Sequence, residues 1–403
     1  MDILVSGMGW IDHTPGGLNR YFADYLRAME GEGHSVRGLM TANGEKTSAP
    51  SYVKEVSREA GKVNPIARVS AFRKAVAEEI RGYRPDVFNP HFALYASLVT
   101  RGLVPDDIPI VTHFHGPWAD ESLVEDNGKR QGLSQKLRYQ MKKNIELMSY
   151  RRSDRFIVLS EYFKDILHRQ YRIAESRIHI IPGAADHQRF VPHDDRDKLR
   201  LELGLAEGQQ VLFCARRLAK RMGIDRLIQA MVPVVAEFPE TILFIAGDGA
   251  MRSQLDQLIA DLNLRDHVFL LGRVSNEDLV RWYQAADISI VPTVTLEGFG
   301  LVTVEALACG TPVLGTPYGG TKEILQHFSP ELLFRDGSPE AMTEKLLAIL
   351  SGGCPVPARE TCRQHVLERY TWEKVARSVH DVFLQAIDER KAKGGVFLEG
   401  RAV

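Results

Sequence analysis

Residues 287–305 of this 403-residue chain read DISIVPTVTLEGFGLVTVE, and they join a strand pattern to a helix pattern. Residues 287–292 form a short apolar run of the kind that predicts a buried strand. Residues 302–309 read as a helix, which Gly310 and the following Thr311-Pro312 would end. A buried strand that leads through a glycine-containing turn into a helix is the building unit of a parallel α/β sheet.

The same stretch carries two carboxylates eight positions apart, Glu297 in the loop and Glu305 on the helix. Gly298 and Gly300 let a ligand approach the backbone closely, and exposed N–H groups at a helix start attract anions and sugar oxygens. Since a helix rises about 1.5 Å per residue, Glu305 would lie roughly 7 Å along the helix from Gly300. The two carboxylates can therefore meet different parts of one long ligand, such as a nucleotide sugar. The alternative is that Glu297 caps the helix and Glu305 is solvated.

Short apolar runs alternate with helical patterns along the chain, which predicts βαβ units and parallel sheets. We expect strands at residues 2–6, 87–89, 110–113, 155–159 and 178–181, and again at 211–215, 241–246, 268–271, 287–292 and 313–315. Residues 182–195 are rich in proline and charge and read as a linker.

These patterns predict an α/β fold of two Rossmann-like domains, at residues 1–185 and 186–375. Residues 376–403 would form a C-terminal helix and tail. Ligands of doubly wound sheets bind beyond the carboxyl ends of the strands. We therefore expect the two domains to face each other across a cleft that holds the active site.

The composition limits the classes of partner. Lysine and arginine number 51 against 52 aspartates and glutamates, so no surplus of positive charge indicates a nucleic acid. The four cysteines never form a Cys-x2-Cys pattern, which argues against a zinc site and a disulfide framework. No apolar run approaches the roughly 18 residues of a membrane span. We expect a cytoplasmic protein that binds small molecules and no metal.

Residues 129–152 hold eight lysines and arginines against one acid, Glu146. Such a basic helical face could meet anionic lipid or a charged acceptor, which would make the protein peripheral at a membrane. A solvated helix face is the alternative.

A glycine turn follows the first predicted strand. Gly16 and Gly17 open a helix there, and a glycine turn at a helix N-terminus suits phosphate or sugar. A tight turn that binds no ligand is the alternative. Gly7 and Gly9 are followed by Asp12 where a dinucleotide fingerprint needs a third glycine, which weakens an oxidoreductase interpretation.

Polar residues also follow later strands. His113 and His115 end the strand at 110–113, where one imidazole could bind a sugar. A histidine hydrogen-bonded within the fold is the alternative, and a metal pair would lack a third ligand. Residues 216–221 place four cations after the strand at 211–215; arginine forks suit phosphate oxygens, and a solvated basic turn is the alternative.

Residues 297–305, continued by ALACGTPVL at 306–314 and by Gly319-Gly320, closely resemble the glutamate-x7-glutamate signature of the family 4 retaining glycosyltransferases. The resemblance extends, motif by motif, over nearly the whole chain. It implies the GT-B fold, with the last helix returning to the first domain. It also implies transfer of a hexose from a nucleoside diphosphate sugar, here expected to be UDP-linked, without metal or cofactor and with the α configuration retained. The acceptor, a saccharide, a lipid-linked sugar or a small molecule, has no readable motif.

The resemblance assigns roles to the two carboxylates and their loop. Glu305 would hold the ribose hydroxyls. Glu297 would hold the sugar ring together with the backbone N–H groups of Phe299, Gly300 and Leu301.

The resemblance also assigns the remaining site residues. Arg217 matches the family's arginine on the leaving diphosphate, but Met222 occupies the position of its lysine, and Arg221 is the neighbour able to replace that charge. His115 matches the strand-end histidine near the reacting carbon better than His113 does. The other residues expected to line the donor are Gly16, Gly17, Gly249 and Val274.

Two other classes of protein remain possible on the residues alone. A glycoside hydrolase also uses two carboxylates, roughly 5 to 9.5 Å apart across the scissile bond, but it has no use for the arginine cluster. A nucleotide-sugar epimerase or a non-catalytic sugar-binding module could use the same two-domain architecture. Sugar release without nucleotide, an isomerised nucleotide sugar, or binding without product would identify them.

Overall fold

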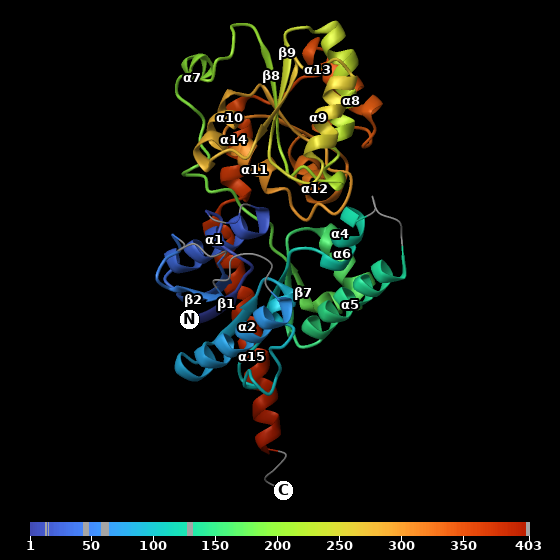
Figure 1. The fold of residues 1–403 in the computed structure, drawn as a ribbon. Helices are drawn as coiled ribbons and strands as arrows, with labels where there is room; N and C mark the ends of the chain where they lie inside the picture. The colour runs from blue at the N-terminus through green and yellow to red at the C-terminus, as the bar shows by residue number, and fades with distance from the viewer. Residues whose placement is uncertain (13, 15, 43–47, 58–63, 127–131, 400–403) are drawn as a thin grey trace. The chain divides into compact units, whose positions relative to one another are not determined.

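The structure is a computed structural model that describes residues 1–12, 14, 16–42, 48–57, 64–126 and 132–399, with side chains up to residue 392 (Figure 1). The chain divides into two compact units. Unit 1 comprises Met1–Pro182 and Trp372–Val403, and unit 2 comprises Gly183–Thr371. The sequence patterns predict these divisions after residues 185 and 375.

Unit 1 contains two parallel sheets. The first has the order β3-β2-β1-β4, with β1 at Asp2–Ser6, β2 at Ser35–Thr41, β3 at Val53–Ser57 and β4 at Val87–Pro90. The second has the order β5-β6-β7, with β5 at Val111–Phe114, β6 at Arg155–Val158 and β7 at Ile178–Ile180. A parallel bridge from Phe88 to Ile110 links the two sheets. Most residues of β1, β4, β5 and β6 are buried, as strands covered on both faces require, whereas β3 and β7 are mostly half-buried.

The helices of unit 1 follow or precede its strands along the chain. They are α1 (Gly17–Gly31), α2 (Pro65–Gly82), α3 (Ala93–Ala96), α4 (Trp118–Asp126), α5 (Leu133–Tyr150), α6 (Glu161–Tyr171) and α15 (Trp372–Glu399). Helix α1 buries one face through Phe22, Leu26 and Met29, each fully buried. The C-terminal helix α15 packs on α1 and is joined to β6 by an ion pair of 2.5 Å between Glu389 and Arg155. Among the described residues, no helix has both the length and the apolar character needed to cross a bilayer.

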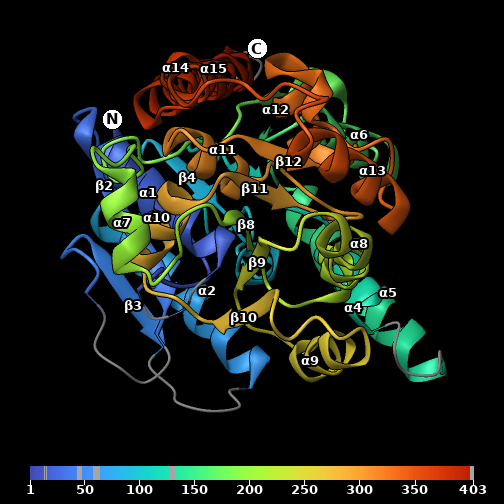
Figure 2. The ribbon, with the colours of Figure 1, turned by 90° about the horizontal axis from the view of Figure 1, so that it is seen from above.

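Unit 2 contains one parallel sheet of order β10-β9-β8-β11-β12, which Figure 2 shows strand by strand. Its strands are β8 (Gln210–Ala215), β9 (Thr241–Ala246), β10 (Val268–Gly272), β11 (Ile288–Val291) and β12 (Val313–Gly315). Its helices are α7 (Arg196–Glu202), α8 (Ile224–Glu237), α9 (Arg252–Asp261), α10 (Asn276–Ala285), α11 (Leu301–Ala308), α12 (Gly319–Phe328), α13 (Pro339–Leu350) and α14 (Arg359–Arg369).

The strand order of unit 2 reverses between β8 and β11. From β8 the chain builds outward to β9 and β10, then returns to place β11 on the other side of β8. At such a reversal the two neighbouring loops diverge to opposite faces, so a crevice opens beyond the carboxyl ends of the strands. The sheet topology therefore singles out the loops after β8 and β11.

The predicted α/β class with parallel sheets is confirmed. Each predicted strand is present, with ends shifted by at most one residue, and the helix expected at 302–309 is α11. The sequence reading missed β2 and β3. Strand β2 contains Gly38, whose lack of a side chain admits Leu26 and Val53 at close range, and a central glycine obscures the strand pattern.

Candidate functional site

The loops at the strand-order reversal of unit 2 meet through a buried ion pair. Arg216 directly follows β8, and its guanidinium pairs with the Glu297 carboxylate and donates to the Thr293 hydroxyl at 2.5 Å. The two charged side chains are only 8% and 10% exposed. The sequence reading assigned no role to Arg216. The neighbouring Arg217, the predicted diphosphate ligand, is exposed at the same strand end.

The loop before Glu297 has a strained backbone. Leu296 adopts φ = 54°, in the left-handed region that a branched side chain enters at a cost. Arg221 holds this turn: its guanidinium donates to the Leu296 carbonyl at 3.0 Å, and its own carbonyl accepts from the N–H of Val294 at 2.9 Å. Arg221 is 9% exposed, and Met222, which stands at the family's lysine position, is also buried. The predicted replacement for the lysine is thus buried against the loop that carries Glu297 and hydrogen-bonded to it.

A glycine begins the helix that carries Glu305. Gly300 is the N-cap of α11 with φ = 89°, and its carbonyl accepts from the N–H of Thr303 at 2.9 Å. The first N–H groups of a helix have no intrahelical partner, so the start of α11 offers donors next to Glu297. The predicted contacts through Phe299, Gly300 and Leu301 lie at this helix start.

A second glycine pair fixes the Glu297 loop from the start of α12. The N–H of Gly320 donates to the Glu297 carbonyl at 3.0 Å. A Cβ atom on Gly319, which has φ = 58°, would lie 2.1 Å from that same carbonyl oxygen. A Cβ atom on Gly320 would lie 2.3 Å from the Cα of Phe299. Only glycine fits at these two positions, which explains why Gly319-Gly320 accompanies the glutamate motif.

Glu305 lies one helical turn into α11 and is 2% exposed. The hydroxyl of Tyr283, on α10, lies 3.5 Å from its carboxylate. No pattern in the sequence indicates Tyr283 as a site residue, because an aromatic residue on a helix is usually part of the core.

The loops after β8, β9 and β10 interlock through their backbones. Leu218 donates to the carbonyl of Asp248 at 3.0 Å, and Gly247 donates to the carbonyl of Gly272 at 2.7 Å. A Cβ atom on Gly249 would lie 2.4 Å from the Leu218 carbonyl oxygen. The fold therefore brings Arg217, Gly249, Val274, Glu297 and the start of α11 to one edge of the sheet of unit 2.

The predicted site residues of unit 1 lie beyond its own strands. Gly16 and Gly17 stand at the start of α1, which follows β1, and His115 follows β5. His115 is joined by a residue that the sequence reading missed: His91, after β4, whose Nδ1 lies 3.1 Å from Nε2 of His115. The signal that could have found it is its place at a strand's carboxyl end, directly after Asn89-Pro90.

The three histidines His91, His113 and His115 stack beside Tyr21. The ring of Tyr21 makes an edge contact with His115, at 4.8 Å between centroids. Burial lowers the pKa of His115 to about 3 and the pKa values of His91 and His113 well below the ordinary value, so all three are neutral. Within the part of the chain that the structure describes, no cluster of three histidine, cysteine or acidic side chains is arranged to hold a metal ion.

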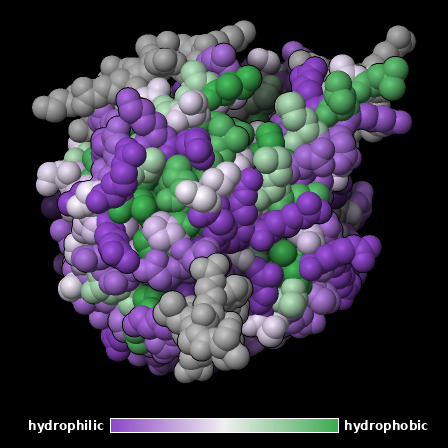
Figure 3. Space-filling model, turned by 90° about the horizontal axis from the view of Figure 1, so that it is seen from below, coloured by the Kyte–Doolittle hydropathy of each residue, from purple (hydrophilic) through white to green (hydrophobic). Residues whose placement is uncertain are grey.

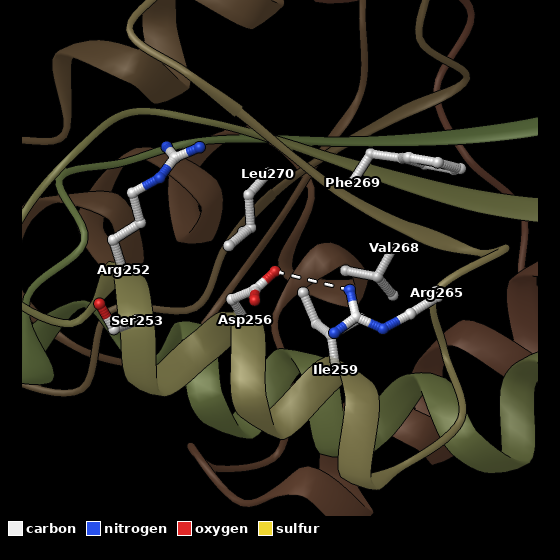
Figure 4. A pocket seen from close by; sticks show the side chains of 8 residues that line it. All are labelled: Arg252, Ser253, Asp256, Ile259, Arg265, Val268, Phe269 and Leu270. Atoms are coloured by element: carbon white, nitrogen blue, oxygen red, sulfur yellow. Dashed lines mark ion pairs between the residues drawn. The ribbon is translucent and has the colours of Figure 1, made fainter.

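A surface pocket of about 400 Å³ lies elsewhere in unit 2, between α9 and the edge strand β10 (Figure 4). An ion pair of 3.8 Å between Asp256 and Arg265 crosses it, and Arg252 and Phe269 line it. It contains none of the predicted site residues.

Comparison with known proteins identifies the family. The model of the group named Glycosyltransferase Family 4 matches residues 15–189, and that of Glycosyl transferases group 1 matches residues 195–368. Together the two matches span most of the chain.

Individual proteins agree with these matches. A GDP-mannose-dependent monoacylated alpha-(1-6)-phosphatidylinositol monomannoside mannosyltransferase of Corynebacterium glutamicum is 33% identical over 48% of this chain and 52% of its own length. The matched part of the chain spans between 52% and 63% of the length of three such curated relatives.

Solved structures share the fold. The sucrose-phosphate synthase of Thermosynechococcus elongatus superposes with a TM-score of 0.79 at 20% identity, over 96% of this chain and 100% of its own. Anabaena Alr3699/HepE, solved with UDP-glucose, superposes with a TM-score of 0.74 at 17% identity, over 96% of this chain and 100% of its own. At these identities the likeness concerns the fold, which is of the GT-B type. With the glutamate motif set at the strand-order reversal of unit 2, the chain belongs to the family 4 glycosyltransferases.

Proposed function

We propose that this protein transfers a hexose from a nucleoside diphosphate sugar to an acceptor hydroxyl. The observation that carries the proposal is the arrangement at the strand-order reversal of unit 2. There a buried Arg216–Glu297 pair, a glycine-started helix and the exposed Arg217 come together beyond the carboxyl ends of β8 and β11. Such a site offers acceptors for hydroxyl groups and a cation for phosphate.

The donor is proposed to lie along this edge. Glu305 accepts hydrogen bonds from the ribose diol, while Glu297 and the N–H groups of Phe299, Gly300 and Leu301 bind the sugar ring. Gly249 and Val274 face the nucleotide from the loops after β9 and β10. The nucleotide is proposed to be uridine diphosphate, as in the HepE complex, and guanosine diphosphate, used by the mannosyltransferase relative, is the competing choice.

Electrostatic stabilisation of the leaving diphosphate is the proposed source of the rate enhancement. As the bond from the anomeric carbon to the diphosphate oxygen breaks, negative charge grows on the diphosphate, and Arg217 and Arg221 stabilise it. One such donor is worth a few kcal/mol in comparable sites. The acceptor oxygen bonds to the anomeric carbon on the same face, and its proton passes to the leaving phosphate oxygen, so the α configuration is retained. This route uses no metal and no protein nucleophile. The products are the glycoside and the nucleoside diphosphate.

Unit 1 is proposed to hold the acceptor, with His115 close to the reacting carbon and Gly16 and Gly17 along the donor. The acceptor class stays open among saccharides, lipid-linked sugars and small molecules.

We also propose that α5 contacts an anionic membrane surface. Helix α5 exposes an apolar stripe, and Figure 3 shows hydrophobic atoms projecting at the upper right, where this helix begins. The stripe consists of Leu133, Leu137, Met141 and Met148, which are 89%, 73%, 54% and 43% exposed. Lys136 and Arg138 are exposed beside it. An apolar face with flanking cations is the pattern of a helix that lies in a lipid interface. Lys129 and Arg130, also part of the predicted basic segment, lie outside the described residues.

The proposal is tested in two steps. A thermal-shift screen of UDP-, GDP- and ADP-hexoses should find one nucleotide that raises the melting temperature, since a ligand that binds the folded state alone stabilises it. Incubation of that donor with candidate acceptors should then release the nucleoside diphosphate in step with a new α-glycoside. Sugar release without acceptor, or conversion of the donor to its epimer, would refute transfer.

A further inference from the structure

The orientation of one buried amide in unit 1 is fixed by its surroundings. Asn89 in β4 is fully buried, and its Nδ2 donates to the backbone carbonyl of Val111 at 2.5 Å. Because a carbonyl accepts only, the nitrogen of the amide must point there. The amide oxygen then accepts from the hydroxyl of Tyr25 at 2.9 Å. The two ends of the Asn89 amide are therefore distinguished by the fold.

This orientation determines where the neighbouring histidines carry their protons. Nε2 of His91 lies 3.0 Å from the Asn89 oxygen, so it must carry a proton and donate. A neutral imidazole has one N–H group, and burial keeps His91 neutral. Its Nδ1 atom therefore carries no proton and presents a lone pair. That lone pair lies 3.1 Å from Nε2 of His115, which must therefore donate to it.

The same amide fixes the third histidine. Nδ2 of Asn89 lies 2.9 Å from Nδ1 of His113 and donates to it, which leaves the proton of His113 on Nε2. That N–H is buried without a partner among the described residues. One asparagine thus sets the tautomers of all three rings.

We propose that Tyr25, Asn89 and His91 are positioning residues that hold His115 in the Nε2–H tautomer, so that its Nδ1 presents a lone pair to the ligand. His115 is partly exposed, and the hydrogen bond that the structure records for its ring is the one at Nε2. In the site it acts as a hydrogen-bond acceptor. It therefore selects a ligand group that can donate, such as a sugar hydroxyl, over a carboxylate, whose oxygens would face the lone pair without a proton between them.

The statement about the ligand rests on the proposed function, whereas the statement about the tautomers does not. The free protein, labelled with ¹⁵N at the histidine rings, tests the tautomers directly by two-bond nitrogen–proton correlation spectra at pH 7. His115→Gln assigns the signal. A protonated Nε2 and an unprotonated Nδ1 in His115 are expected. A proton on Nδ1, an averaged mixture of tautomers or an imidazolium would overturn the inference.

Two substitutions of His91 test the chain of hydrogen bonds. His91→Phe keeps a stacked ring but removes the acceptor for His115, and His91→Gln restores a side-chain acceptor. The ratio kcat/KM with the hexose donor should fall about tenfold in His91→Phe and stay within about threefold in His91→Gln.

These measurements distinguish failure of the positioning role from failure of the proposed function. If His91→Phe and His91→Gln lose activity equally, the positioning role is wrong. Wild-type protein should also prefer the hexose donor over the uronate with the same nucleotide by at least tenfold, and His115→Gln should narrow that preference. Equal use of the two donors overturns the selection. If no nucleotide sugar is bound but the spectra agree, the proposed function fails and the tautomer assignment stands.

Discussion

The Arg216–Glu297 pair allows a sharp prediction about stability. Both side chains are at most 10% exposed, and Arg216 also donates to Thr293. Arg216→Ala leaves the Glu297 carboxylate buried without its cation, and loss of one member of a buried pair costs about 3 to 5 kcal/mol. The cost should appear first in the loop after β11 and in α11, whose start the pair supports.

Hydrogen exchange followed by mass spectrometry measures this opening locally. Peptides that cover β11 and α11 should lose about 3 kcal/mol of protection in Arg216→Ala. Arg217→Ala is the matched control, since this neighbour is exposed, and it should change protection by less than about 0.5 kcal/mol. The double variant Arg216→Met with Glu297→Gln should be more stable than the sum of the single changes predicts.

A loss below about 1 kcal/mol in Arg216→Ala, or equal losses in Arg216→Ala and Arg217→Ala, would refute the reasoning. The two variants also separate structure from binding. Arg217→Ala should weaken binding of the donor and leave the fold unchanged, whereas Arg216→Ala should weaken both donor binding and the stability of the loop.

Three further predictions concern other parts of the chain. Burial raises the pKa of the Glu146 carboxyl group to about 7 from its ordinary value of 4.5. Between these two pH values the folded state keeps a proton that the unfolded state has lost. The free energy of unfolding therefore falls by about 3 kcal/mol as the pH rises through this range. Urea unfolding at pH 5 and pH 8 should show Glu146→Gln gaining about that much relative to wild type, and a pH-independent difference would contradict the assignment. Gly319→Ala should displace the Glu297 loop and abolish donor-induced thermal stabilisation, whereas Gly352→Ala, at φ = 76° with no atom within 4 Å of the added methyl group, should cost only its backbone strain. Leu137→Glu in α5 should reduce sedimentation with phosphatidylglycerol vesicles at least tenfold and leave binding to the donor intact; equal sedimentation of both proteins would remove the membrane proposal.

The fold was predictable because its signal is repeated. Short apolar runs recur at the spacing of βαβ units, and the glutamate motif lies on one continuous strand, loop and helix. The missed strands β2 and β3 mix apolar with polar and charged residues, and β3 buries only Val53, so neither strand shows a continuous apolar run.

The candidate site was less accessible to sequence reasoning. The motif identified Glu297 and the arginine cluster, but it could not show that Arg216, rather than Arg217, pairs with that carboxylate. Neighbouring residues after a strand point in different directions, and only the register of β8 against β11 decides which reaches the loop. His91 follows a different strand, β4, and its contact with His115 depends on the order of the strands, which a local pattern does not contain.

The central claim is that a nucleotide sugar binds at the strand-order reversal of unit 2. A crystal structure of the protein soaked with the nucleoside diphosphate found by thermal shift tests it most directly. The account predicts ribose hydroxyls within hydrogen-bond distance of the Glu305 carboxylate and the diphosphate against the guanidinium of Arg217. Nucleotide bound instead in the pocket between α9 and β10, with Glu297 and Glu305 untouched, would contradict it.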